Sequence, residues 1–243
     1  MSVWGKIIGG TAGLAIGGPI GALIGVGIGA AVDASAERLL EDPQAKRRVT
    51  FTIGVIALAA KMAKADGRVT REEVDAFKAV FHFDQSEMKN VGKIFDLARQ
   101  STAGYEAYAK QIAGLMKGHP SALEDLLEAL FYIAKSDGTV HPKELEFIRS
   151  VSSIFGFDDS WFEALQQRHT GQSSDNPYVV LGVDHSISDK DLKSHYRKLV
   201  KENHPDRLIA EGVPSEFIAV ATRRVAEINA AYDTIKQERG LKS

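Results

Sequence analysis

The chain has 243 residues, 44% of them hydrophobic and 26% charged, which leaves room for one large or two modest folded domains and an appendage. Its formal net charge of −2 gives no general reason to expect a nucleic-acid-binding protein. The chain contains no cysteine, which excludes disulfide frameworks and cysteine-ligated zinc sites.

The N-terminal segment from Ile7 to Val32 contains no charged residue. Because a helix needs roughly 20 residues to cross a bilayer, this segment predicts a transmembrane helix. Glycine recurs at every fourth position, and small residues at this spacing let helix backbones approach closely in lipid. We therefore predict a helix-association seam, and with it a homodimer contact, along the following glycines: Gly5, Gly9, Gly13, Gly17, Gly21, Gly25 and Gly29.

Basic residues near this segment are unevenly distributed. Only Lys6 precedes it, whereas Arg38 and the three basic residues at positions 46–48 follow it. The positive-inside rule therefore predicts a single span with the C-terminal bulk in the cytoplasm.

Two alternatives to a transmembrane helix stay open for the N-terminal segment. Residues 34–36 (Ala-Ser-Ala) resemble a signal-peptidase site, which would make the segment a cleaved signal peptide. The glycine-rich segment could also lie in the membrane interface or pack against soluble partners.

The middle of the chain contains an internal repeat. Residues 63–74 recur 71 positions later as residues 134–145, and both copies place an Asp-Gly turn between two apolar helical patterns. Thr70 and Glu73 have the spacing of a capping box, and Pro142 suits the first turn of a helix. The sequence predicts an all-helical bundle built on a duplicated helix–turn–helix. Its predicted helices are 51–64, 72–81, 87–99, 105–116, 123–135 and 143–155.

The repeated turn has some features of a calcium-binding loop. If Gly67 and Gly138 took the sixth place of such a loop, lysines (Lys64 and Lys135) would occupy the third, where an oxygen ligand is required. We therefore interpret each turn as one helix end followed by the cap of the next helix. A different divalent-metal site stays open only if the two turns meet in space. Its candidate ligands are Asp66, Glu72, Asp137 and Glu144.

The most specific motif is His204-Pro205-Asp206, which lies between two amphipathic helical patterns at 189–203 and 216–237. Proline disfavours a helical conformation for the residue before it, so the chain leaves the first helix at this point. Four cations share one face of the first helix: Lys190, Lys193, Arg197 and Lys201. Such a face suits an acidic protein surface and would steer association electrostatically. Because it has no aromatic stacking platform, no nucleic-acid partner is expected.

A segment upstream completes this pattern: residues 176–183 read Asn-Pro-Tyr-Val-Val-Leu-Gly-Val. Together with the two helices and the tripeptide, it resembles the J-domain of DnaJ-type co-chaperones. The resemblance implies that His204 and Asp206 engage a DnaK-type ATPase and stimulate its ATP hydrolysis. It also implies that Pro205 fixes the turn and that the basic helix docks on the partner. The expected core positions are Tyr178, Leu181, Leu192, Tyr196, Leu199, Phe217, Ile228 and Tyr232.

Other parts of the chain resemble one subgroup of these proteins. The connection at 207–215 is longer than usual, and residues 4–9 read Trp-Gly-Lys-Ile-Ile-Gly; both resemble the membrane-anchored DjlA type. The helical repeat resembles the TerB-type domain, which precedes the J-domain in that subgroup. The resemblance implies a bacterial inner-membrane protein. We predict an anchor and juxtamembrane segment at 1–48, a TerB-like domain at 49–170, a linker at 171–175 and a J-domain at 176–243.

Two functions follow from these features. The first is a membrane-anchored co-chaperone that acts on a DnaK-type chaperone. The alternative is a TerB-like stress-response scaffold or metal-sensing protein with an auxiliary J-domain. No serine, cysteine or phosphate-loop pattern appears, so we expect neither an enzyme nor a cofactor.

Overall fold

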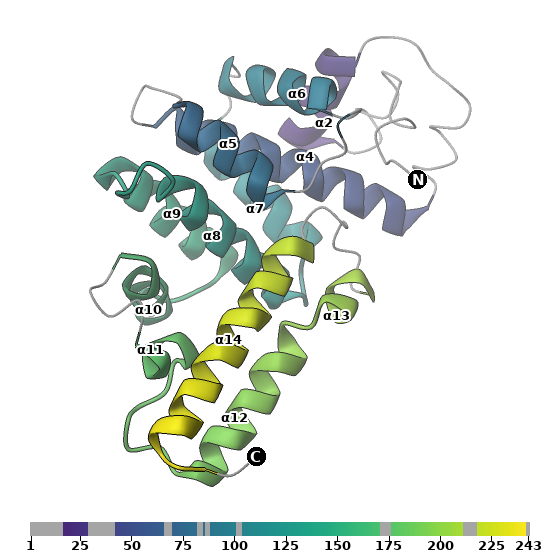
Figure 1. Cartoon of the computed structure of the whole chain (residues 1–243). Coiled ribbons are helices and arrows are strands. Elements are labelled where there is room, and N and C mark those ends of the chain that lie inside the picture. Colours follow the sequence, from purple (N-terminus) through teal and green to yellow (C-terminus); the bar gives the residue numbers. More distant parts are fainter. Residues whose placement is uncertain are drawn as a thin grey trace.

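The computed structural model of the chain describes residues 17–28, 42–65, 70–81, 85, 88–100, 104–170, 176–210 and 218–241, with only the backbone for 24–28. Every regular element within these ranges is a helix, which confirms the all-α fold class (Figure 1). The helices are α2 (Gly18–Ile28), α4 (Pro43–Ala63), α5 (Arg71–Val80), α6 (Met88–Gln100), α7 (Tyr105–Leu115), α8 (Pro120–Ala134), α9 (Pro142–Phe155), α10 (Asp159–Thr170), α11 (Pro177–Leu181), α12 (Asp189–Glu202), α13 (Pro205–Ala210) and α14 (Ile218–Glu238).

Helix α4 is the central element of a bundle formed by α2 to α10. Its residues 49–60 are buried around the whole circumference, because α2, α6, α7, α8 and α9 all pack against it. The helix begins eight residues before the predicted start at position 51. Asp42 explains this earlier start, since its side chain accepts a hydrogen bond from the Gln44 N–H at 3.0 Å and Pro43 occupies the first turn.

The duplicated units are α4–α5 and α8–α9, and each packs against the other: α5 lies on α8, and α9 lies on α4. The predicted capping box is present, because the Glu73 N–H donates to Thr70 Oγ1 at 3.1 Å and the Thr70 N–H donates to Glu73 Oε2 at 2.7 Å. In the second copy, the His141 N–H donates to Glu144 Oε2 at 3.0 Å. The two copies therefore begin their second helices in the same way.

Most of the predicted membrane helix lies outside the described residues. Within them, Gly17 and Gly18 have φ angles of +68° and +61°, a conformation that glycine adopts readily. Helix α2 begins at Gly18, with Pro19 in its first turn. Among the described residues, no helix combines the length and apolar character needed to cross a membrane.

Helix α2 packs into the bundle against α4, α6 and α7. Ile20 and Leu23 are buried in the bundle core, and Gly54 of α4 allows this close approach: a methyl group there would lie 2.9 Å from Ile20 Cδ1. Of the glycine ladder, Gly21 is buried in α2, and Gly25 lies further along the same helix. Gly5, Gly9, Gly13 and Gly29 lie outside the described residues. The helix-association seam therefore stays a prediction.

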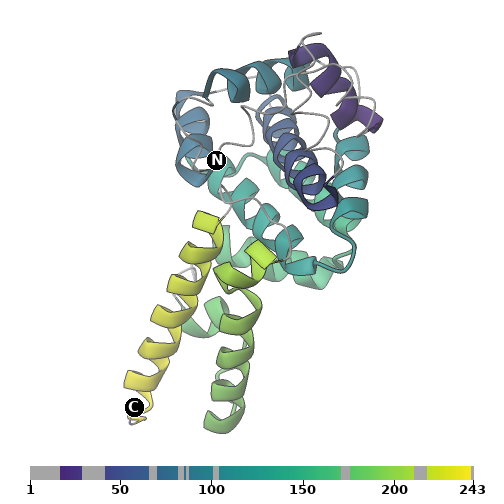
Figure 2. The same cartoon turned by 90° about the vertical axis from the view of Figure 1, so that its right-hand side faces the viewer.

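The C-terminal domain is a pair of long helices, α12 and α14, with α11 packed against α14 (Figure 2). Of the predicted core positions, Tyr178, Leu181, Leu192 and Ile228 are buried, and Tyr196, Leu199 and Tyr232 pack against them. Phe217 lies outside the described residues. The connection between α12 and α14 contains a short helix, α13, from Pro205 to Ala210, which the sequence patterns do not predict. Pro205 suits the first turn of that helix, and Leu208 is fully buried.

Candidate partner-binding site

The His204-Pro205-Asp206 turn lies between the end of α12 and the start of α13. The buried Asn203 closes α12, because its side-chain amide donates to the Leu199 carbonyl at 2.8 Å. The Asp206 N–H then donates to His204 Nδ1 at 3.2 Å, which holds the backbone of the turn. The side chains of both predicted binding residues face solvent, with 52% of the His204 side chain and 86% of the Asp206 side chain exposed. The turn therefore presents a fixed backbone and two accessible polar groups.

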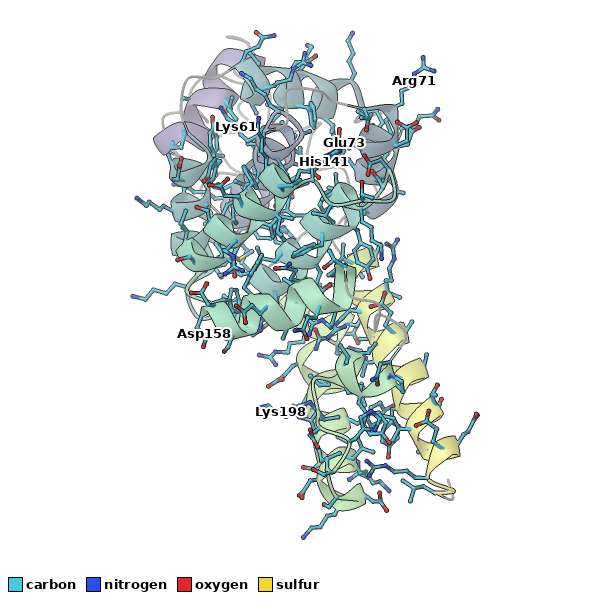
Figure 3. The ribbon with its side chains drawn as sticks, turned by 90° about the vertical axis from the view of Figure 1, so that its left-hand side faces the viewer. Lys61, Arg71, Glu73, His141, Asp158 and Lys198 are labelled. Carbon is cyan, nitrogen blue, oxygen red and sulfur yellow. The ribbon has the colours of Figure 1, made fainter. Side chains whose placement is uncertain are left out.

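The predicted basic face also lies in this region. Lys190, Lys193, Arg197 and Lys201 are all exposed on α12, whereas Leu192 on the opposite side is 1% exposed. Lys198 projects outward from the same helix (Figure 3). The structure thus places the four predicted cations on the helix that leads into the turn.

A groove of about 570 Å³ runs from α12 to α13 beside the turn. Its lining combines two partly buried apolar side chains with cations and His204. The lining residues are Tyr196, Arg197, Val200, Lys201, His204 and Arg207. A surface of this composition offers a partner apolar contact at its floor and positive charge at its edges.

Two sets of contacts hold α12 in place. The Tyr196 ring stacks on the Tyr232 ring of α14 at 3.9 Å between centroids, and its hydroxyl donates to Asn229 Oδ1 at 3.0 Å. At the other end, Arg239 donates to Asp189 Oδ1 at 2.9 Å and to the Tyr178 hydroxyl at 3.0 Å. Sequence reasoning missed Arg239 because its partners lie at least 50 residues away along the chain.

The candidate metal ligands do not gather into one site among the described residues. Glu72 is exposed. Asp137 lies by the second turn, where its Oδ1 accepts the Thr139 N–H at 3.1 Å and its Oδ2 is 3.4 Å from His141 Nε2. Asp66 lies outside the described residues, which contain no group of three or more histidine, aspartate or glutamate side chains suited to a metal ion.

The two repeats do meet in space. The candidate ligand Glu144 of the second copy lies near Glu73 of the first, an acid that is not among the candidate ligands. Glu144 is 1% exposed, and Glu73 is its counterpart in the first copy. Figure 3 labels Glu73 in the first turn of α5 and His141 just before α9. Burial raises the pKa of Glu144 to about 7, and the Glu73 carboxylate adds to this rise, while the hydrogen bond from the His141 backbone opposes it. The capping-box pattern could have singled out Glu73, because a capping acid points back into the turn.

Three protein families together match most of the chain. Residues 1–48 match the family model of the co-chaperone DjlA transmembrane domain, residues 52–167 that of the tellurite resistance protein TerB, and residues 176–240 that of the DnaJ domain. Co-chaperone protein DjlA of Vibrio cholerae is 30% identical over 82% of this chain and 81% of its own length. Co-chaperone protein DjlA of Shewanella oneidensis is 28% identical over 86% and 85%, and that of Coxiella burnetii is 27% identical over 74% of each chain. No solved structure matches the chain.

An exposed His-Pro-Asp turn after a basic helix, in a DnaJ domain, defines a J-domain co-chaperone, a regulator of another protein's activity. The order of the three matched domains and the similarity across more than four fifths of the chain then narrow this class. The chain belongs to the DjlA family of co-chaperones, whose N-terminal domain is a transmembrane anchor.

Proposed function

We propose that this protein stimulates ATP hydrolysis by a DnaK-type chaperone and that it does so at the cytoplasmic face of the bacterial inner membrane. The observation that carries the proposal is the exposed turn of His204, Pro205 and Asp206, held at the end of a helix with four exposed cations. The protein contributes no chemistry of its own. It binds the ATPase and favours the state in which the bound ATP is hydrolysed.

The basic face and the turn have separate tasks in this proposal. Lys190, Lys193, Arg197 and Lys201 attract an acidic surface of the ATPase, which raises the association rate and depends on salt. His204 and Asp206 then make the contacts that change the activity of the ATPase. Pro205 limits the conformations of the turn, so less conformational entropy is lost on binding.

The proposed orientation rests on the distribution of basic residues around the N-terminal segment, with one lysine before it and several basic residues after it. In this orientation the C-terminal bulk lies in the cytoplasm. Protease added to right-side-out spheroplasts should leave the J-domain intact, and protease added to inverted vesicles should cleave it. The reverse pattern contradicts the orientation. Self-association through the glycine ladder is a further part of the proposal, and chemical crosslinking in the same vesicles tests it.

The activity is tested with the full chain in lipid nanodiscs and the DnaK-type chaperone of the same organism. Single-turnover ATP hydrolysis should accelerate at least about tenfold with the parent chain, and His204→Gln or Asp206→Asn should abolish the acceleration. Asp233→Asn is the matched control, because Asp233 is another exposed aspartate of the same domain, with 62% of its side chain accessible. Absence of stimulation by the folded parent chain would contradict the proposal.

A further inference from the structure

The J-domain packs directly against the helical bundle. Helix α14 contacts α8 of the bundle, and α11 contacts α10. The contact joins segments far apart in sequence, since Tyr132 and Glu227 are 95 residues apart. The interface therefore fixes the J-domain by side-chain contacts as well as through the chain connection.

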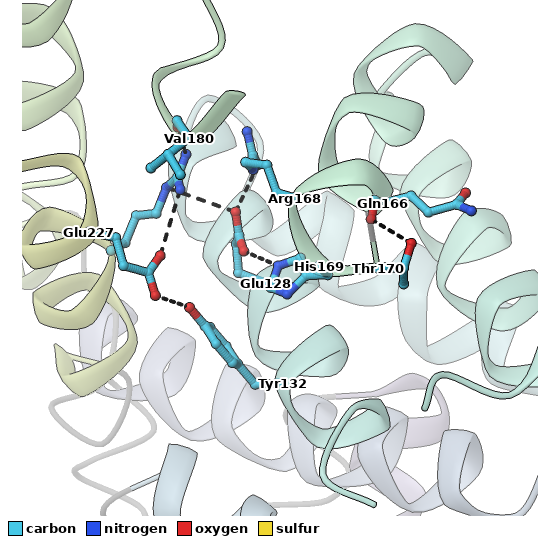
Figure 4. Close-up of polar contacts among 9 residues, drawn as sticks. Glu128, Tyr132, Gln166, Arg168, His169, Thr170, Val180 and Glu227 are labelled. Carbon is cyan, nitrogen blue, oxygen red and sulfur yellow. Dashed lines mark hydrogen bonds and ion pairs between the residues drawn. The ribbon is translucent and has the colours of Figure 1, made fainter. Parts of the chain in front are cut away.

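A buried carboxylate lies at the centre of this interface. Glu128 of α8 has 6% of its side chain exposed, and it binds Arg168 at 2.8 Å and His169, both from α10 (Figure 4). From the J-domain, Arg224 Nε lies 3.9 Å from Glu128 Oε1, and its guanidinium donates to the Val180 carbonyl at 3.4 Å. Burial favours protonation of Glu128, but the His169 hydrogen bond and the two arginines outweigh it and lower its pKa to about 2. Glu128 is thus ionised, and Arg224 is the J-domain cation that faces it.

A second polar contact lies beside the first. The Tyr132 hydroxyl of α8 donates a hydrogen bond to Glu227 of α14. The Arg223 guanidinium lies 4.7 Å from the Tyr132 ring centre, and Arg224 is 3.8 Å from Glu227. Burial, with the hydrogen bond to Glu227, raises the pKa of Tyr132, so the phenol keeps the proton that it donates.

The interface also reaches the functional turn. Helix α13 begins at Pro205 of that turn, and its Leu208 is fully buried. Leu208 joins Val220 and Ala221 of α14 in the same continuous apolar core as the bundle. The segment immediately after the His-Pro-Asp turn is therefore anchored where the two domains meet.

This packing leaves the binding face accessible. His204, Asp206 and the four cations of α12 all stay exposed while α14 and α11 contact the bundle. Helix α2 lies at the end of the bundle opposite the J-domain (Figures 1 and 2). The bundle therefore contacts the J-domain without covering the turn.

We propose that Arg224, Tyr132 and Leu208 are positioning residues for partner binding: they lock the J-domain to the bundle, so the ATPase meets a turn of fixed orientation. The proposal rests on the proposed function, because the occupant of the binding face is the same DnaK-type ATPase. A fixed turn loses less orientational freedom on binding, so the contact acts on affinity for the ATPase. Once the complex has formed, the contacts of His204 and Asp206 are the same, so the maximal hydrolysis rate is unaffected.

The test measures domain orientation and activity on the same full-length chain in nanodiscs. The chain has no native cysteine, so Lys110→Cys in α7 and Lys198→Cys in α12, both exposed, can be spin-labelled selectively. In this background we compare Arg224→Gln, Arg224→Lys and Tyr132→Phe with Lys93→Gln, an exposed control on α6. Pulsed EPR gives the distribution of distances between the labels. ATPase titrations give the half-saturating concentration and the maximal rate.

Arg224→Gln should broaden the distance distribution and raise the half-saturating concentration at least about fivefold, with an unchanged maximal rate. Tyr132→Phe should have a smaller effect in the same direction, and Arg224→Lys should restore most of the affinity. If Arg224→Gln gave a distance distribution as narrow as that of the parent, the proposal that Arg224 holds the J-domain against the bundle would be overturned. A broadened distribution with unchanged affinity would overturn the positioning role. If the parent chain does not stimulate the ATPase, the proposed function fails as well. The ATPase assays of the parent and of His204→Gln show this failure independently of the distance measurement.

Discussion

The outer face of α12 and the interface between α14 and α8 use the same residue types in opposite surroundings. Lys193 and Arg197 are exposed on α12, where water screens their charge and a partner can reach them. Arg224 has 11% of its side chain exposed and faces the buried carboxylate of Glu128. Exposed cations contribute little to folding and much to recognition. A buried pair instead makes each partner necessary to the other, because removing one leaves an uncompensated charge.

The comparison is tested most severely at Glu128. Glu128→Ala leaves Arg168, His169 and Arg224 without their carboxylate, and it should lower the free energy of unfolding by about 3–5 kcal/mol. Urea unfolding of the full chain in nanodiscs, followed by far-ultraviolet circular dichroism, measures the change. Glu146→Ala on α9 is the control, because Glu146 is exposed. A change below about 1 kcal/mol at Glu128 would mean that the buried network contributes no more than a surface ion pair.

The buried carboxyl group of Glu144 sharpens the comparison. It lies near another acid, Glu73, whereas Glu128 lies among cations. The pKa of Glu144 is raised to about 7, above its ordinary value of 4.5, so the folded state binds the proton more tightly than the unfolded state. Stability from this group is therefore fully present below pH 4.5 and is lost as the pH rises through 7. Between pH 5 and pH 8 the parent should lose about 2 kcal/mol more than Glu144→Gln.

Chemical denaturation at the two pH values measures this difference. Since every other titrating group is common to both chains, the difference between parent and variant isolates the acid pair. Glu73→Gln should weaken the dependence without removing it, because burial is the largest cause of the raised Glu144 pKa and the Glu73 carboxylate only adds to it. Identical pH profiles for the parent and both variants would contradict the assignment.

The smallest effect on folding, with a clear effect on binding, is expected on α12. The double substitution Lys193→Glu and Arg197→Glu should change the free energy of unfolding by less than about 0.5 kcal/mol, because both side chains are exposed. Affinity for the DnaK-type ATPase should fall at least about tenfold at low salt. Lys93→Glu with Lys110→Glu makes the same charge change on exposed positions of the bundle. Equal loss of affinity in both double variants would assign the effect to net charge rather than to this face.

Local patterns predicted α4 to α9, α12, α14 and the exposed turn, because periodicity, caps and proline positions lie within a few residues of what they determine. They did not predict α10 or α13. The same patterns gave no information on the interdomain contacts. Tyr132 of the bundle and Glu227 of the J-domain are 95 residues apart, so their pairing depends on the tertiary fold. One local signal was available, since Glu128 lies within the apolar run of 123–135 and is buried with it.

The choice between Glu72 and Glu73 shows the same limit on a smaller scale. Both acids lie in the first turn of α5, and composition alone does not separate them. The capping box identifies Glu73 as the acid that turns back toward Thr70, but only the packing of α5 on α8 reveals that Glu144 lies opposite. The helix α13 was missed for a similar reason, because the burial of Leu208 that stabilises it comes from α14.

The meeting of Glu73 with Glu144 also bears on how a doubled chain can evolve. Where two identical repeats contact each other through equivalent positions, each residue faces an identical residue of the other repeat. A pair of complementary residues can arise there only after the two repeats have diverged at that position. Neighbouring positions have done so, since Thr70 corresponds to His141 and Arg71 to Pro142, whereas the acid is the same in both copies. A single inherited replacement in either copy would therefore be enough to turn this symmetric contact into an asymmetric one.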